Sequence, residues 1–182
     1  MSRHALTHRE IDQTVPSADC DRSAYLRSMR QVAGAVAVVT TDGAAGRHGA
    51  TVTAFCSVSA DPPTLLVCLR GGSRIAQAVA SNGVFTLSVL PEEAVTVARI
   101  FAGEFDRDCG DRFGRVALVD LPGLAPAIAG SVSLACRVVK SERHESHVIF
   151  LGRVIALDHR VLAPLVYRDG RYCALRHAEA LA

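Results

Sequence analysis

The chain has 182 residues, of which 49% are hydrophobic, and its 20 basic and 18 acidic side chains leave a formal net charge of +2. A chain of this length buries a sizeable core as one domain, and the hydrophobic fraction excludes a disordered protein. The balanced charge, without a block of Lys or Arg, predicts no nucleic-acid partner.

The ends of the chain differ from its middle. Residues 1–20 are polar and contain no apolar signal segment, so we expect a flexible N-terminal lead-in, one domain over 21–177 and a short tail at 178–182. No apolar run is long enough to span a bilayer. The six cysteines show no C-x-x-C spacing, which favours reduced, packed thiols. These features predict a cytoplasmic protein that does not bind membranes.

Short elements fill the first half of the domain. A helix is expected over 23–32, with Asp21 or Ser23 as its cap, and a β-branched strand over 35–41. A glycine-containing turn over 42–49 leads to a strand over 50–59, which the Asp61-Pro62-Pro63 segment ends. A third strand over 64–70 precedes a helix over 73–80 that Ser73 caps and that ends near Asn82-Gly83.

The second half is richer in strands. A strand over 84–90 and a helix over 91–102 precede an irregular region over 105–126. Two long strands, over 131–140 and 148–157, are separated by a charged, exposed segment over 141–147. The Asp169-Gly170 pair, between strands over 165–167 and 171–175, is a strong hairpin signal.

This order of elements predicts a mainly β protein. Strands come in runs with a few short helices between them, without the regular alternation of a parallel βαβ sheet. A closed antiparallel barrel with helices packed outside would also remove the exposed strand edges.

Several common functional motifs are absent. The chain has no G-x-G-x-x-G, no G-x-x-x-x-G-K-[ST], no G-x-S-x-G and no H-E-x-x-H. His144 and His147 are three residues apart, and on one strand such residues face opposite sides. The sequence therefore predicts no metal site.

Two segments have the composition of a ligand site. The first, over 49–63, is a strand rich in small hydroxyl residues, which would let a flat ring approach backbone donors and acceptors. The alternative is a barrel strand with Ser and Thr on its wet face. The second, Arg70-Gly71-Gly72-Ser73-Arg74, opens a helix and suits a phosphate. The alternative is an ordinary N-cap with exposed arginines.

The segment over 49–63 resembles the G-x-T-A-x-x-F-x-S-V-S-x-D-P-P signature of the short-chain flavin reductases, the reductase components of two-component flavin-dependent monooxygenases. The resemblance covers residues 23–175. It continues at Ser73-Arg74 and Phe101 and through the segments 85–90, 111–113, 130–136, 147–152 and 165–172.

The resemblance implies a fold and a set of ligands. The fold would be an antiparallel Greek-key split β-barrel of the FMN-binding type, assembled as a homodimer. The reaction would be reduction of FMN or FAD by NADH or NADPH, with a monooxygenase as the partner that receives reduced flavin. Because the chemistry is carried by the flavin and the nicotinamide, the protein needs positioning groups more than an acid–base pair.

The resemblance also implies which residues bind. The flavin would be held by the residues Gly49, Ala50, Thr51, Val52, Thr53, Ser57, Val58, Ser59, Ser73 and Arg74. Of these, the segment 51–53 would line the ring, and the last five would hold the ribityl and phosphate end. The nicotinamide would be bordered by His147, Tyr167, Arg168 and Tyr172, with His147 also the candidate catalytic residue.

Two departures from the family pattern stand out. Glu145-Ser146 precede His147 where the family often has Gly-Asp, and Val52 stands where Ala is common. The second hypothesis is a non-catalytic flavin- or haem-binding split-barrel protein, a sensor or a carrier. His147 and the hairpin around Asp169-Gly170 favour the reductase, and steady-state oxidation of NADH with free flavin separates the two hypotheses.

Overall fold

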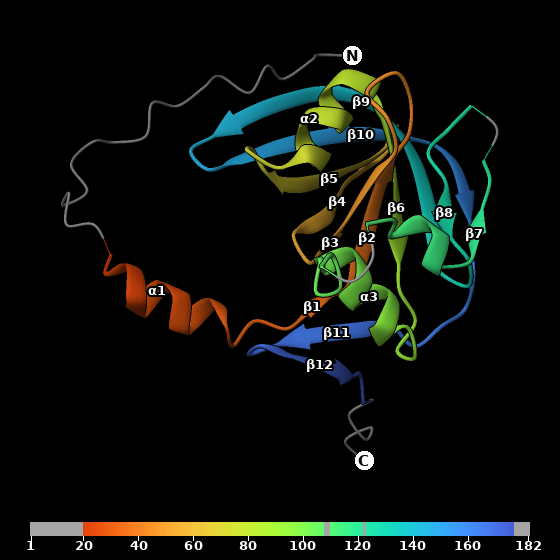
Figure 1. Ribbon diagram of the computed structural model, residues 1–182. Coiled ribbons are helices and arrows are strands. Elements are labelled where there is room, and N and C mark those ends of the chain that lie inside the picture. Colours follow the sequence, from red (N-terminus) through yellow and green to blue (C-terminus); the bar gives the residue numbers. More distant parts are fainter. Residues whose placement is uncertain (1–19, 108–109, 122, 177–182) are drawn as a thin grey trace.

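A seven-stranded antiparallel sheet forms the body of the computed structural model, which describes residues 20–107, 110–121 and 123–176 (Figure 1). Its strand order is β3-β2-β6-β9-β10-β5-β4. The strands are β2 (Ala37–Thr41), β3 (His48–Val52), β4 (Phe55–Ala60), β5 (Pro63–Arg70), β6 (Val84–Val89), β9 (Val132–His144) and β10 (His147–Asp158).

Smaller elements surround this sheet. A three-stranded sheet contains β1 (Gly34–Ala35), β11 (Leu165–Arg168) and β12 (Arg171–Ala174), and β7 (Leu118–Val119) pairs with β8 (Ala127–Ile128). The helices are α1 (Arg22–Met29), α2 (Arg74–Asn82) and α3 (Val95–Ala102), with a 3₁₀ turn at Phe113–Arg115. No helix among the described residues has the length and apolar character needed to cross a bilayer. The expected lead-in before residue 20 and the tail at 178–182 lie outside the described residues.

The sheet is curled into a split barrel. β3 and β4 form its two edges, yet only Thr53 and Ala54 separate them in the chain. Three trans peptide units span no more than roughly 11 Å, so the two edges must approach each other. The described strands nevertheless leave β3 and β4 unpaired with each other. The closed barrel expected from the strand pattern is wrong in this one respect. The antiparallel split-barrel architecture is confirmed.

The core consists of two clusters on opposite faces of β2, all five residues of which are buried. Ala37 and Val39 pack in a cluster with Phe85 and Phe150, whereas Val38 belongs to the cluster on the other face with α3. Because successive side chains of a strand alternate between faces, one short apolar strand joins the barrel interior to the layer outside it.

The helices occupy different positions. α3 packs in the outer cluster through residues such as Phe101, as expected. α2 packs on the barrel through Ile75, Ala76 and Val79, which belong to the interior cluster. α1 extends away from the barrel (Figure 1) and has no buried residue.

The local signals of the first half predicted most element ends. Asp21 caps α1 by accepting hydrogen bonds from the Ser23 and Ala24 amides, and Ser73 caps α2. The strand expected over 50–59 divides into β3 and β4. Asp61-Pro62 forms the turn of the β4–β5 hairpin, and Pro63 begins β5.

The second half departs further from the prediction. α3 begins at Val95 instead of residue 91, because the Glu92 amide donates to the Ala163 carbonyl and Pro91 forms a bridge with Pro164. The charged segment over 141–147 extends β9 and β10 to a turn at Glu145 and Ser146. β7 lies within the region expected to be irregular, and its partner β8 follows directly after that region.

Candidate functional site

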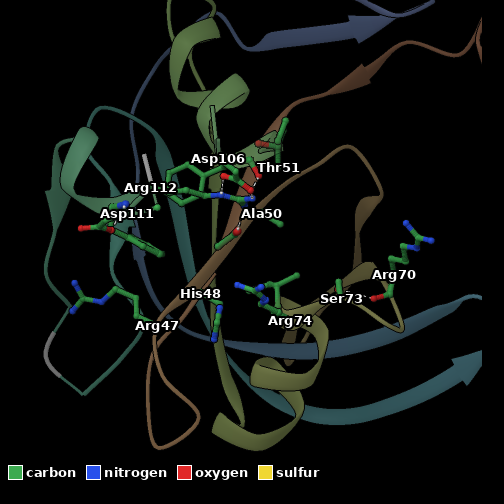
Figure 2. A pocket seen from close by; sticks show the side chains of 16 residues that line it. Arg47, His48, Ala50, Thr51, Arg70, Ser73, Arg74, Asp106, Asp111 and Arg112 are labelled. Atoms are coloured by element: carbon green, nitrogen blue, oxygen red, sulfur yellow. Dashed lines mark hydrogen bonds and ion pairs between the residues drawn. The ribbon is translucent and has the colours of Figure 1, made fainter. Parts of the chain in front are cut away.

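A cavity of about 910 Å³ opens between β3, the start of α2, the end of α3 and the segment that follows α3 (Figure 2). We call it the main cavity. Its lining comprises the residues Arg47, His48, Gly49, Ala50, Thr51, Arg70, Ser73, Arg74, Ile75, Phe101, Ala102, Asp106, Gly110, Asp111, Arg112 and Phe113. Its size lies within the range of small-molecule sites. The structure thus brings together the first of the predicted flavin-binding residues and the predicted phosphate-binding helix start.

The edge of β3 faces the main cavity with free backbone groups. Gly49 pairs with Thr40 and Thr51 with Val38 across the β2–β3 ladder, without a register shift. The Gly49 carbonyl accepts a hydrogen bond from Arg112 at 3.0 Å, so it points away from β2. Because backbone groups alternate in direction along an antiparallel strand, the Thr51 amide and carbonyl point the same way. They offer a donor and an acceptor to a flat ring.

Gly49 and Thr51 also fix β3 against α3. A Cβ atom on Gly49 would lie 2.5 Å from Cε1 of Phe101, so the absent side chain makes room for that ring rather than for a ligand. The Thr51 hydroxyl donates to the Ala98 carbonyl at 2.6 Å. The side chain of Thr51 is therefore engaged with the protein, and its backbone groups remain for binding.

The α2 N-terminus forms the facing wall. The Ser73 hydroxyl donates to the Arg70 carbonyl at 2.6 Å and accepts from the Ala76 amide at 3.3 Å, which is an N-cap arrangement. The amides of Arg74 and Ile75 lie in the first helical turn, where no intrahelical acceptor exists. In Figure 2 the Arg74 side chain points toward β3, whereas the Arg47 and Arg70 side chains point outward at opposite ends. Arg74 is thus the arginine best placed for an anion.

The main cavity carries more positive than negative charge. Four arginines and two aspartates line it. Arg47 pairs with Asp42 at 2.7 Å, and Arg112 pairs with Asp106 at 2.5 Å. The hydrogen bond from Arg112 lowers the pKa of the Asp106 carboxyl, and the charges of Arg112 and Arg74 act in the same direction. The described lining therefore favours an anionic ligand such as a phosphate ester.

A smaller cavity of about 300 Å³ adjoins the main one and shares Thr51 and Ala102 with it. We call it the side cavity. Tyr167 and Tyr172 border it with Val52 and Thr53, and the two tyrosine rings form an edge-to-face pair with centroids 5.3 Å apart. Burial raises the pKa of the Tyr172 hydroxyl. Two predicted nicotinamide residues and all three predicted ring residues, Thr51 included, therefore line this space.

The other two predicted nicotinamide residues lie outside both cavities. The Arg168 guanidinium donates to the Gln31 side chain at 2.9 Å. His147 is exposed at the tip of the β9–β10 hairpin, where its Nδ1 lies 2.9 Å from the Ser146 hydroxyl. Within one chain, His147 therefore does not line the side cavity that Tyr167 and Tyr172 border. Its register partner on β5 is Arg70, which lines the main cavity.

The hairpin also corrects the argument about the two histidines. His144 and His147 are directly opposite each other in the β9–β10 ladder, because the turn lies between them. They share one face of the hairpin and not opposite faces of one strand. No cluster of three metal-ligating side chains occurs among the described residues.

The remaining predicted flavin residues, Ser57, Val58 and Ser59, lie on β4 and line neither cavity. Val58 is 50% exposed, and the Ser59 hydroxyl bonds to the backbone of Asp61 in the hairpin turn. In a single chain these residues lie at the surface of the barrel, as the alternative interpretation of a strand with Ser and Thr on its wet face expects.

Sequence reasoning assigned no role to several lining residues, notably Phe101, Asp106 and Arg112. Phe101 and Arg112 belong to segments that carried the family resemblance, so a signal existed without a function attached to it. Asp106 had no such signal, because its role depends on the fold of the segment between α3 and the 3₁₀ turn.

Comparisons with known proteins show which family the chain belongs to. The family model for the flavin reductase like domain matches residues 29–176. An FMN reductase (NADH) RutF of Methylorubrum extorquens is 37% identical over 175 residues, which cover 95% of this chain and 84% of that protein.

Solved structures extend the likeness to the whole fold. The NADH:FAD oxidoreductase SgcE6 of Streptomyces globisporus superposes with a TM-score of 0.79 at 28% identity, covering 92% of this chain and 97% of that one. The styrene monooxygenase flavin reductase of Pseudomonas putida S12 gives a TM-score of 0.74 at 26% identity, covering 85% and 98%. The chain belongs to the flavin reductase like family.

Proposed function

We propose that the protein is an NADH-dependent flavin reductase that reduces FMN and supplies the reduced flavin to a flavin-dependent monooxygenase. The main cavity carries this proposal, because it sets the free backbone edge of β3 opposite the α2 N-terminus and Arg74. The edge suits a ring with donors and acceptors on its rim, and the helix start suits a phosphate. FMN combines these two chemical features in one molecule, and the relative from Methylorubrum extorquens is named for it.

The flavin is a substrate, and the chemistry is a transfer of hydride from the dihydronicotinamide to the flavin ring, with the remaining proton taken from solvent. The protein orients the two rings. The Thr51 amide and carbonyl hold the flavin edge, Arg74 holds the phosphate, and the side cavity beside Tyr167 and Tyr172 admits the nicotinamide. Such positioning lowers the barrier without an acid–base pair.

A homodimer is part of the proposal. α1 has no buried residue, and the described part of one chain leaves its apolar side chains uncovered: Tyr25 is 55% exposed and Met29 is 46% exposed. The distance of His147 from the tyrosine pair is a second argument, because a partner subunit could present the hairpin tip to the site. Sedimentation should give twice the monomer mass at micromolar concentration, and a stable monomer would contradict the dimer.

The monooxygenase partner follows from the reductase components among the structural relatives, such as that of styrene monooxygenase. The proposed location is the cytoplasm, where NADH is regenerated. Fractionation of cells that express the chain checks the location. Co-purification from the native source with a flavin-dependent oxygenase tests the partner.

Anaerobic oxidation of NADH tests the central activity. With FMN added, the absorbance of NADH and that of oxidised flavin should fall together, and equal molar amounts of the two should be consumed. NADH oxidation that persists after flavin is stripped away contradicts the proposal. Tight flavin binding without any NADH oxidation would instead support the carrier or sensor hypothesis.

A further inference from the structure

Arg112 lines the main cavity and donates four hydrogen bonds to other parts of the protein. Its Nε and Nη2 atoms donate to the two carboxylate oxygens of Asp106, at 2.8 and 2.5 Å. Its Nη1 atom donates to the carbonyls of Gly49 and Phe101, each at 3.0 Å. One guanidinium thus joins β3, the end of α3 and the segment beyond α3.

These contacts leave Arg112 little capacity to bind a ligand. A guanidinium has five N–H donors, and four of those of Arg112 are used by protein acceptors. Its side chain is only 27% exposed. Arg74 differs, because its side chain is exposed and points toward β3 (Figure 2). The two arginines therefore line the same cavity with different chemical roles.

The Arg112 contacts act on the part of β3 that faces the cavity. The Gly49 carbonyl lies on the same free edge as the Thr51 backbone groups, two residues away. A second contact, from the Thr51 hydroxyl to the Ala98 carbonyl, ties the strand to the preceding turn of α3. Together the two contacts set how far the β3 edge stands from the helix and so where the Thr51 amide and carbonyl lie.

We propose that Arg112 is a positioning residue, which holds the β3 edge in the place where it receives the flavin ring. This inference rests on the proposed function. It assigns Arg112 to the ring and not to the phosphate, since its donors bind protein carbonyls and Asp106. Loss of Arg112 should displace the ring-binding backbone and leave phosphate recognition at Arg74 intact.

The decisive experiment compares Arg112→Lys with Arg74→Ala, using FMN and riboflavin as the two probes. Lysine keeps the charge but lacks the planar fork, so it cannot serve Asp106 and both carbonyls together. We expect Arg112→Lys to raise the dissociation constants of FMN and riboflavin by the same factor, about tenfold. We also expect kcat at saturating flavin and NADH to fall by about tenfold, because small misplacements of reacting groups slow a reaction strongly. Arg74→Ala should raise the dissociation constant of FMN and leave that of riboflavin unchanged.

A matched control is available in Arg160, which pairs with Asp158 at 3.0 Å outside both cavities. Arg160→Lys should leave both dissociation constants and kcat unchanged. If Arg112→Lys does not melt cooperatively, Asp106→Asn serves in its place, because it keeps both carbonyl contacts. It should give a smaller loss, again equal for the two flavins.

Three results would overturn the inference. A loss for FMN alone would make Arg112 a phosphate ligand. A lower melting temperature with unchanged dissociation constants and kcat would make its role purely structural. If the melting temperature, the dissociation constants and kcat all stay unchanged, Arg112 has no positioning role. Failure of the proposed function is distinguishable, because the wild-type protein would then bind neither flavin or fail to oxidise NADH.

Discussion

Arg74→Ala is the sharpest test of where the flavin phosphate binds. Arg74 is the first residue of α2 and follows the Ser73 cap, so its side chain and the first-turn amides face the same cavity. The substitution removes the guanidinium and leaves the helix and its cap in place. It should therefore change binding of a phosphate ester much more than it changes folding.

The structure sets the size of the effect. A hydrogen bond to a charged group contributes about 1.5–3 kcal/mol, and solvent screening of an exposed side chain moves the value toward the lower end. Arg74 is exposed in one chain, so we expect a loss of about 1.5 kcal/mol, or roughly tenfold in dissociation constant. The helix N-terminus still attracts the phosphate with about 0.3–1 kcal/mol, so binding should weaken without disappearing.

Flavin fluorescence titrations give the two dissociation constants that decide the question. The FMN value should rise roughly tenfold, whereas the riboflavin value should stay the same, because riboflavin has no phosphate. Arg153, on β10 and outside both cavities, offers a control variant, Arg153→Ala, that should affect neither flavin. Equal losses for FMN and riboflavin, or no loss for either, would refute the assignment of Arg74 to the phosphate.

Three further predictions follow from single contacts. Ser73→Ala should lower the free energy of unfolding by about 1 kcal/mol in urea titrations, with little change in FMN affinity, because the hydroxyl already bonds within the cap; a tenfold loss of affinity would make it a ligand. Gly49→Ala should destabilise the protein by about 1–3 kcal/mol, because its Cβ would lie 2.5 Å from Phe101; an unchanged melting temperature would contradict this packing. Burial raises the pKa of the Cys136 thiol to about 12, so iodoacetamide at neutral pH should leave Cys136 unmodified in the native protein, and peptide mass spectrometry that finds it alkylated would refute its burial.

Local sequence signals predicted those elements whose ends depend on neighbouring residues. α2 begins after Ser73 and ends at Gly83, because a hydroxyl cap and a left-handed glycine each determine a helix end through contacts within one turn. Asp169 and Gly170 both have positive φ, as the tight turn of the β11–β12 hairpin requires. The start of α3 could not be predicted in this way, because the chain around Pro91 pairs with a segment more than seventy residues away in the sequence, at Pro164.

The site shows the same division. Composition and the family resemblance indicated Thr51 and Arg74, and the fold places both in one cavity. The contacts of Arg112 with Asp106 and two carbonyls join three elements, so no local pattern could indicate them. His147 illustrates the opposite limit: the resemblance indicated it, but one chain leaves it at a hairpin tip outside the cavities.

The split in the barrel explains why the proposed ligand site lies at β3. In a barrel strand with neighbours on both sides, all backbone N–H and C=O groups form ladder hydrogen bonds, whereas in an edge strand about half of them stay unpaired. β3 is such an edge, and an uncovered edge would be open to pairing with other chains. Here Arg112 occupies the Gly49 carbonyl, and α3 holds the Thr51 side chain, so only a short stretch of backbone remains free. The same feature that leaves the barrel incomplete thus provides the backbone donors and acceptors that we assign to the flavin ring.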